Sequence, residues 1–203
     1  MGHTPLLASA SASFENKIPD SGTYPARCIQ VIDLWTQPTN YMGVEKKQRK
    51  VRITFELPTE LEIFNPEKGE QPYILSKNYT LSLSDTSGLR IDLESWRGQK
   101  FTSEELEWFD IHNILGKECS LGVIHKKSDD WKKTFANISS VGKAMKGMVT
   151  PEAINPLVYF TIEDFDQAIY DSLPEFLRTK IADSKEFKAI GGVDEEIVKD
   201  IYN

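Results

Sequence analysis

Residues 118–141 read ECSLGVIHKKSDDWKKTFANISSV, in which two stretches of alternating apolar and polar residues flank the polar turn Ser128–Trp131. Alternation with a period of two is typical of half-buried strands, and two such strands around a short turn predict a β-hairpin. Four lysines, at positions 126, 127, 132 and 133, surround the single ring of Trp131. This hairpin is the last part of a β pattern that begins near residue 23.

Three earlier segments have the same alternation and predict strands. They are Thr23–Leu34, Arg49–Leu57 and Tyr73–Leu83. The residues between them, 36–48 and 59–72, are polar or rich in turn formers and predict loops.

Between the third strand and the hairpin the period becomes helical. Leu89, Leu93 and Trp96 recur at helical spacing, so Trp96 is expected to pack in the core, and Gly98 follows as a terminator. A second helix should begin at Thr102, with Glu105 completing a capping box. Three strands, a helical insertion and two more strands is the element order of the OB-fold, a five-stranded Greek-key barrel, although an SH3-like barrel or a small sandwich has a similar order.

The charge is distributed unevenly along the chain. The formal net charge is −7, and residues 151–203 contain 12 acidic and 5 basic side chains, so the whole acidic excess lies there. We therefore predict a loose N-terminal arm over 1–20, a binding barrel over 21–150 and a helical acidic segment over 151–203. No apolar run is long enough for a membrane span, and a cytoplasmic location is expected.

Enzymatic sites are not apparent. The histidines are scattered, Cys28 and Cys119 are expected to stay reduced and buried, and no zinc spacing or phosphate loop occurs. The Asp129-Asp130 pair could hold a metal, but aspartate is also favoured in turns for backbone reasons. The sequence thus favours a protein that is not an enzyme and needs no cofactor.

An OB-fold binds oligonucleotides on the face of strands two and three, between the loops that join strands one to two and four to five. Both loops are basic, and cations can contact phosphates while aromatic rings stack on bases. The alternative is that these lysines only keep exposed strand edges soluble, and that the aromatic residues are core. The candidate nucleic-acid-binding residues are Tyr41, Lys46, Lys47, Arg49, Lys50, Arg52, Lys77, Tyr79, Lys126, Lys127, Trp131, Lys132, Lys133 and Phe135.

The run from Lys77 to Lys127 also resembles a known group of proteins. The resemblance is densest in Leu93–Gly98 (LESWRG), Phe109-Asp110 and Leu115–Lys117. These segments resemble bacteriophage OB-fold proteins that bind single-stranded DNA in replication and recombination, over about residues 14 to 148. The resemblance implies single-stranded DNA binding without catalytic residues.

Three tryptophans depart from that resemblance. Trp35, Trp108 and Trp131 stand where it predicts glycine. At Trp131 the hairpin turn independently favours glycine, because a bulky residue at positive φ is strained. Either the rings are genuine, with Trp131 as a stacking side chain, or the deduced sequence misreads glycine codons at these positions.

The acidic C-terminal segment carries apolar residues among its charges. A short amphipathic helix there could dock on a replication or recombination protein, whereas the alternative is an acidic end that only maintains solubility. The stretch 160–190 could instead pack against the barrel or form a homo-oligomer contact. The candidate partner-binding residues are Asp194, Glu195, Glu196, Ile197, Ile201 and Tyr202. A protein-interaction module without nucleic-acid affinity is the second function that the sequence allows.

Overall fold

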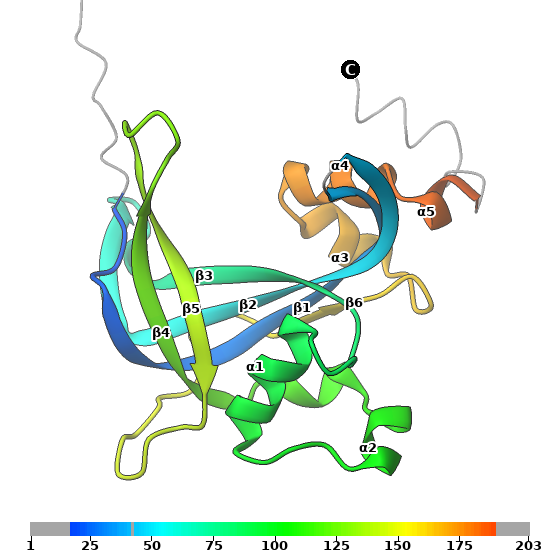
Figure 1. Cartoon of the computed structure of the whole chain (residues 1–203). Helices are drawn as coiled ribbons and strands as arrows, with labels where there is room; N and C mark the ends of the chain where they lie inside the picture. The colour runs from blue at the N-terminus through cyan, green and yellow to red at the C-terminus, as the bar shows by residue number, and fades with distance from the viewer. Residues whose placement is uncertain (1–16, 42, 190–203) are drawn as a thin grey trace, which may run out of the picture.

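The computed structural model describes residues 17–41 and 43–189 and contains a nearly closed antiparallel barrel with helical additions. The barrel strands are β1 (Gly22–Tyr41), β2 (Val44–Asn65), β3 (Gly69–Thr80), β4 (Glu118–Lys127) and β5 (Thr134–Gly142). Their order in the sheet is β3-β2-β1-β4-β5 (Figure 1). The fold is therefore the predicted one, an OB-like barrel.

β1 joins the two halves of the barrel because it pairs with β4 at one end and with β2 along the rest of its length. Its first residues, from Gly22 to Arg27, pair with β4, and the rest of the strand pairs with β2. The register shifts at Cys28/Gln30 and again at Asp33/Trp35. Such bulges bend a strand and increase its twist, which lets one long strand belong to both halves of the barrel.

The loops predicted at 36–48 and 59–72 are mostly strand. β1 and β2 continue outward as a paired arm until Tyr41 faces Val44, where the side chain of Asn40 accepts a hydrogen bond from the N–H of Gly43. Gly43 has a φ of 81° and so permits the tight reversal. Polar residues form strands here because a two-stranded arm in solvent needs hydrogen-bonded backbone rather than an apolar face.

Helix α1 (Gly88–Arg97) covers one end of the barrel. It inserts Leu89, Leu93 and Trp96 into the core, and the indole N–H of Trp96 donates to the carbonyl oxygen of Glu118 at 2.7 Å. Gly98 ends the helix with a φ of 74°. The prediction that Trp96 packs in the core is confirmed, and each such buried side chain contributes about 1.5–3 kcal/mol of hydrophobic stabilisation.

The remaining connections before β4 also follow the sequence pattern. Helix α2 (Ser103–Trp108) begins with the predicted capping box between Thr102 and Glu105, and the short 3-10 helix η1 (Ile111–Ile114) follows it. Cys28 and Cys119 lie as free thiols in the barrel core, where burial raises the pKa of Cys28 to about 12. Neither thiol is therefore activated as a thiolate at neutral pH.

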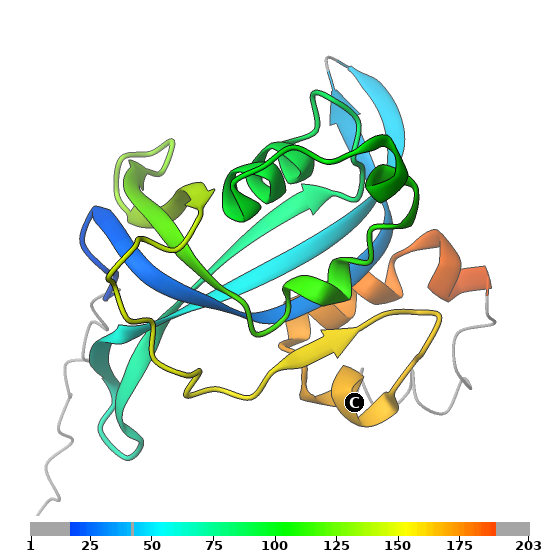
Figure 2. The same cartoon turned by 90° about the horizontal axis from the view of Figure 1, so that it is seen from below.

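The C-terminal segment packs on the opposite side of β1 from α1. It contains β6 (Val158–Phe160), α3 (Gln167–Ser172), α4 (Glu175–Ala182) and α5 (Lys185–Ala189). β6 pairs in parallel with β1, and the helices lie beside it (Figure 2). Phe160, Tyr170 and Leu177 form a second core with Ile32 and Leu34 of β1. Of the alternatives open from the sequence, packing against the barrel is the one observed.

Two buried side chains fix the chain that leads to this segment. Glu56 on β2 is fully buried and accepts hydrogen bonds from the backbone N–H groups of Ile154 and Asn155, at 2.7 and 2.9 Å. Arg27 on β1 donates to the carbonyl oxygens of Thr150 and Pro151. Residues 150–155 are thus attached to the barrel wall, although the predicted domain boundary falls there.

Trp35 and Trp131 are the only non-glycine residues with positive φ in the described part of the chain, at 57° and 61°. Trp35 lies buried at the β1 bulge, and its indole N–H has no hydrogen-bond partner among the described residues. Trp131 is exposed at the hairpin tip. The backbone at both positions has a left-handed conformation that glycine adopts without strain. The backbone of Trp108, at the end of α2, does not have a positive φ.

We expect position 131 to prefer glycine over alanine, and position 108 to prefer alanine over glycine. All four variants lose an exposed ring, so comparing Ala with Gly at one site isolates the backbone effect. Trp131→Gly should be more stable than Trp131→Ala by about 1–2 kcal/mol. Trp108→Ala should be more stable than Trp108→Gly by about 0.5–1 kcal/mol. Urea unfolding of the four proteins measures both differences. If the same residue, alanine or glycine, gives the higher free energy of unfolding at both positions, the expectation is contradicted.

Candidate nucleic-acid interface

Two hairpin arms stand at opposite ends of the outer face of β2 and β3. One is the end of the β1–β2 pair, residues 36–48, and the other is the β4–β5 hairpin, residues 124–135 (Figure 1). Helix α4 lies beside the first arm. We call the outer face of β2 and β3 between these arms the saddle.

The β4–β5 arm presents its lysines to solvent. Lys126, Lys127, Lys132 and Lys133 are all exposed, and the only ion pair that any of them makes within the described residues is a long one, 3.9 Å from Lys132 to Asp130. The Lys127 ammonium lies 5.1 Å from the ring centre of Trp131. Three of the four lysines that the sequence predicted at this tip therefore make no ion pair among the described residues, and the fourth makes only this long one.

Ser128 and Asp130 organise the turn that carries these lysines. The Ser128 hydroxyl donates to the Asp130 carboxylate and accepts from the N–H of Lys133, and Asp130 also accepts from the N–H of Lys132. These hydrogen bonds lower the pKa of Asp130. The carboxylate is thus engaged in backbone hydrogen bonds, and no group of three or more potential metal ligands occurs among the described residues.

In the β1–β2 arm the predicted cations differ in availability. Lys46 and Lys47 are exposed, and Tyr41 is the last residue of β1 at the same end. The Lys50 ammonium instead donates to the side chains of Gln48 and Thr80 at 2.7 and 2.8 Å. Partial burial lowers the pKa of Lys50. Lys46 and Lys47 are therefore as exposed as the hairpin lysines, whereas the ammonium of Lys50 is partly occupied by hydrogen bonds within the protein.

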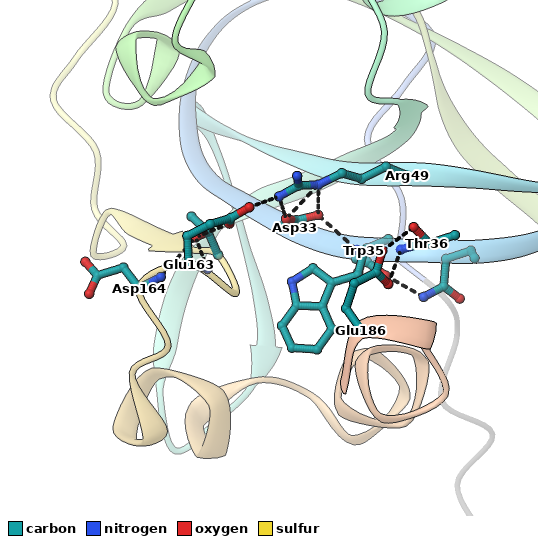
Figure 3. A network of polar contacts seen from close by, with 10 residues as sticks. Asp33, Trp35, Thr36, Arg49, Glu163, Asp164 and Glu186 are labelled. Atoms are coloured by element: carbon teal, nitrogen blue, oxygen red, sulfur yellow. Dashed lines mark hydrogen bonds and ion pairs between the residues drawn. The ribbon is translucent and has the colours of Figure 1, made fainter. Parts of the chain in front are cut away.

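Arg49 is paired with acidic side chains of the molecule, although 41% of its own side chain is exposed. Its guanidinium donates to the buried carboxylate of Asp33 and, at 2.8 Å, to Glu163 of the C-terminal segment (Figure 3). The bond with Asp33 raises the pKa of Arg49, and burial raises the pKa of Asp33. Glu186 adds a second link by accepting from the backbone N–H of Thr36 at 3.0 Å. Arg49 joins the barrel to the helices and does not belong to the free basic surface.

Arg52 is the cation at the centre of the saddle. It alternates with the core residues Val51 and Ile53, so its side chain points to the outer face of the sheet. It donates to the side-chain oxygen of Asn78 on β3 at 3.2 Å, and its guanidinium lies 5.4 Å from the ring centre of Phe176 on α4. Burial lowers the pKa of Arg52. The guanidinium plane is thus fixed by two partners, neither of which is an acid.

Lys77 and Tyr79 do not reach this surface. The Tyr79 side chain is in the barrel core with 5% exposure, and both its hydroxyl and the Lys77 ammonium donate to Asp92 on α1 at 2.7 Å. Lys77 and Tyr79 are two positions apart and therefore lie on the same face of β3. This face is turned toward α1 and not toward the saddle. Tyr79 is therefore a core residue and Lys77 a partner of Asp92, and the sequence could not show which face of β3 the helix covers.

Asn78 of the saddle and Phe176 of the adjoining helix α4 are absent from the sequence-based prediction. Asn78 is a polar strand residue without a distinctive pattern, and Phe176 lies on a helix assigned to a separate segment. The predicted partner-binding residues Asp194, Glu195, Glu196, Ile197, Ile201 and Tyr202 all lie outside the described residues. Phe135 is exposed on β5, one register pair from the turn of the hairpin.

No protein-family model matches the chain, and no curated protein or solved structure is similar to it at a significant level. Within the described residues, no helix has both the length and the apolar character needed to cross a membrane. The function therefore has to be inferred from the geometry of the chain itself.

Proposed function

We propose that this protein binds single-stranded DNA with little sequence preference. The observation that carries the proposal is the placement of two arms with exposed lysines, of which only Lys132 is in a long ion pair among the described residues, across one face of an OB-like barrel. Such a concentration of free cations is unexpected in a chain with a net charge of −7. Lysines track a phosphate backbone without reading bases, so the same surface accepts any sequence.

The saddle favours a single strand over a duplex. Its central cation, Arg52, is fixed against a ring and an amide, which is an arrangement suited to stacking against an exposed base. A paired duplex presents its bases edge-on inside grooves and offers no exposed face for such stacking. A role in bacteriophage replication or recombination, with the acidic end recruiting partner proteins, is the biological setting we propose on the sequence resemblance.

Fluorescence anisotropy of a labelled oligo-dT, titrated with the purified full chain at low and raised salt, tests this proposal. We expect tight binding that weakens steeply with salt, because each neutralised phosphate releases counterions. Unlabelled duplex should be a poor competitor. Failure to bind oligo-dT at low salt would refute the proposal and favour a protein-interaction module instead.

A further inference from the structure

An open cavity of about 430 Å³ lies at the seam between β3 and β5. The strand order places these two strands at the ends of the sheet, so no ladder joins them. The cavity is lined by Phe64 of β2, Gln71, Tyr73 and Ile74 of β3, Phe135 of β5 and Lys17 of the preceding segment. It is separate from the saddle residues Arg52 and Asn78, which lie further along β2 and β3.

Large apolar side chains around this cavity are exposed. Phe64 has 38% of its surface exposed, Phe135 43% and Ile74 49%. The rings of Phe64 and Tyr73 meet edge to face with centres 5.1 Å apart, which fixes their orientation. Exposed aromatic groups gathered around one hollow mark a binding surface, because water contact at such groups is unfavourable.

The surroundings of the cavity indicate which ligand it fits. Phe135 is the register partner of Lys126, and directly opposed residues of an antiparallel pair project to the same side. The next pair, Thr134 and Lys127, projects to the opposite face of the hairpin, so Lys126 is the hairpin cation on the Phe135 side. The side-chain amide of Gln71 makes no hydrogen bond in the described part of the chain, so it can donate and accept. A cation, aromatic faces and a free amide together match a nucleotide.

We infer that the seam cavity takes one or two unstacked bases of the single strand, with Phe135 and Phe64 as the stacking groups. This inference rests on the proposed function and extends the binding track from the saddle around the open edge of the barrel. Lys126, opposite Phe135, holds an adjoining phosphate. An apolar peptide is a poorer occupant, because it offers no anion to the Lys126 ammonium beside Phe135.

The test compares a Phe64→Ala/Phe135→Ala variant with the unmodified protein by oligo-dT anisotropy at several salt concentrations. Removing a stacked base contact lowers affinity by roughly 5- to 150-fold, but it leaves phosphate contacts in place. We therefore expect weaker binding with an unchanged salt slope. An oligonucleotide with abasic sites in place of bases should bind the variant and the unmodified protein equally. Trp108→Ala, which removes an exposed ring from α2, is the matched control and should change neither quantity.

A second measurement needs no substitution and covers the case of a variant that does not fold. Photo-crosslinking of an oligonucleotide carrying 5-bromodeoxyuridine to the unmodified protein should label peptides that contain Phe64, Tyr73 or Phe135. If oligo-dT binds the double variant with unchanged affinity, or if crosslinks avoid these peptides, the cavity is not a base site although the proposed function stands. If the unmodified protein does not bind oligo-dT at all, both the function and this site are refuted.

Discussion

Replacing Lys126, Lys127, Lys132 and Lys133 together with alanine should lower the affinity for oligo-dT by roughly 100- to 1,000-fold at 0.1 M salt, if each lysine neutralises one phosphate. Each lost phosphate contact on a single strand removes about 0.7 from the slope of log K against log salt. The slope should therefore fall by about 3. The loss should be the same for all sequences, because phosphate contacts carry no base information.

A variant that loses four lysines elsewhere separates the loss of the hairpin's phosphate contacts from the general effect of lowering the net charge. Lys100, Lys117, Lys143 and Lys146 are also exposed, but they lie in connections near α1 rather than on either arm. Their joint replacement with alanine should leave the salt slope nearly unchanged. Anisotropy titrations of both variants give the comparison, and equal losses of affinity would exclude the hairpin as a specific contact. Neither variant should lose much stability, since exposed lysines away from ion pairs contribute little.

The sequence predicts the barrel well because its strands and helices follow strong local rules. The alternation of Val51 and Ile53 with polar neighbours, the glycine terminator at 98 and the capping box at Thr102 all act within a few residues of the chain. The arm at 36–48 could not be predicted in this way. Its strands are stabilised by pairing with each other in solvent, so they lack the apolar face on which pattern reading depends.

The candidate binding surface is harder to predict than the fold, because the availability of a cation depends on its neighbours in space. Arg49 and Lys47 have similar local sequences, yet only Arg49 meets Asp33 and Glu163, the second of which is 114 positions away. Lys77 and Tyr79 are likewise taken by Asp92 of α1. The exposure of the hairpin lysines is easier to predict, since a tight turn projects its own side chains into solvent whatever the rest of the chain does.

Replacing Phe160 with alanine should destabilise the whole protein, by about 3–5 kcal/mol. Phe160 is 1% exposed, belongs to the strand that extends the sheet beside β1, and packs against Tyr170 and Phe165. If the C-terminal segment and the barrel form one cooperative unit, Phe160→Ala and Phe55→Ala in the barrel core should each lower the midpoint of the same single transition. In a chain of this size, each kcal/mol lowers Tm by about 2–4 °C, so both variants should unfold roughly 10 °C earlier.

Phe176→Ala provides the control within the same segment. Its ring lies on α4 with 51% of its surface exposed, so its removal should cost less than about 1 kcal/mol. Scanning calorimetry distinguishes the two organisations of the chain, because a single domain unfolds in one transition. Two transitions, with Phe160→Ala shifting only one and Phe55→Ala only the other, would mean that residues 158–189 fold as an appendage. In that case the Arg49 network with Asp33 and Glu163 would be a contact between two units, and the helices could leave the edge of the saddle without unfolding the barrel.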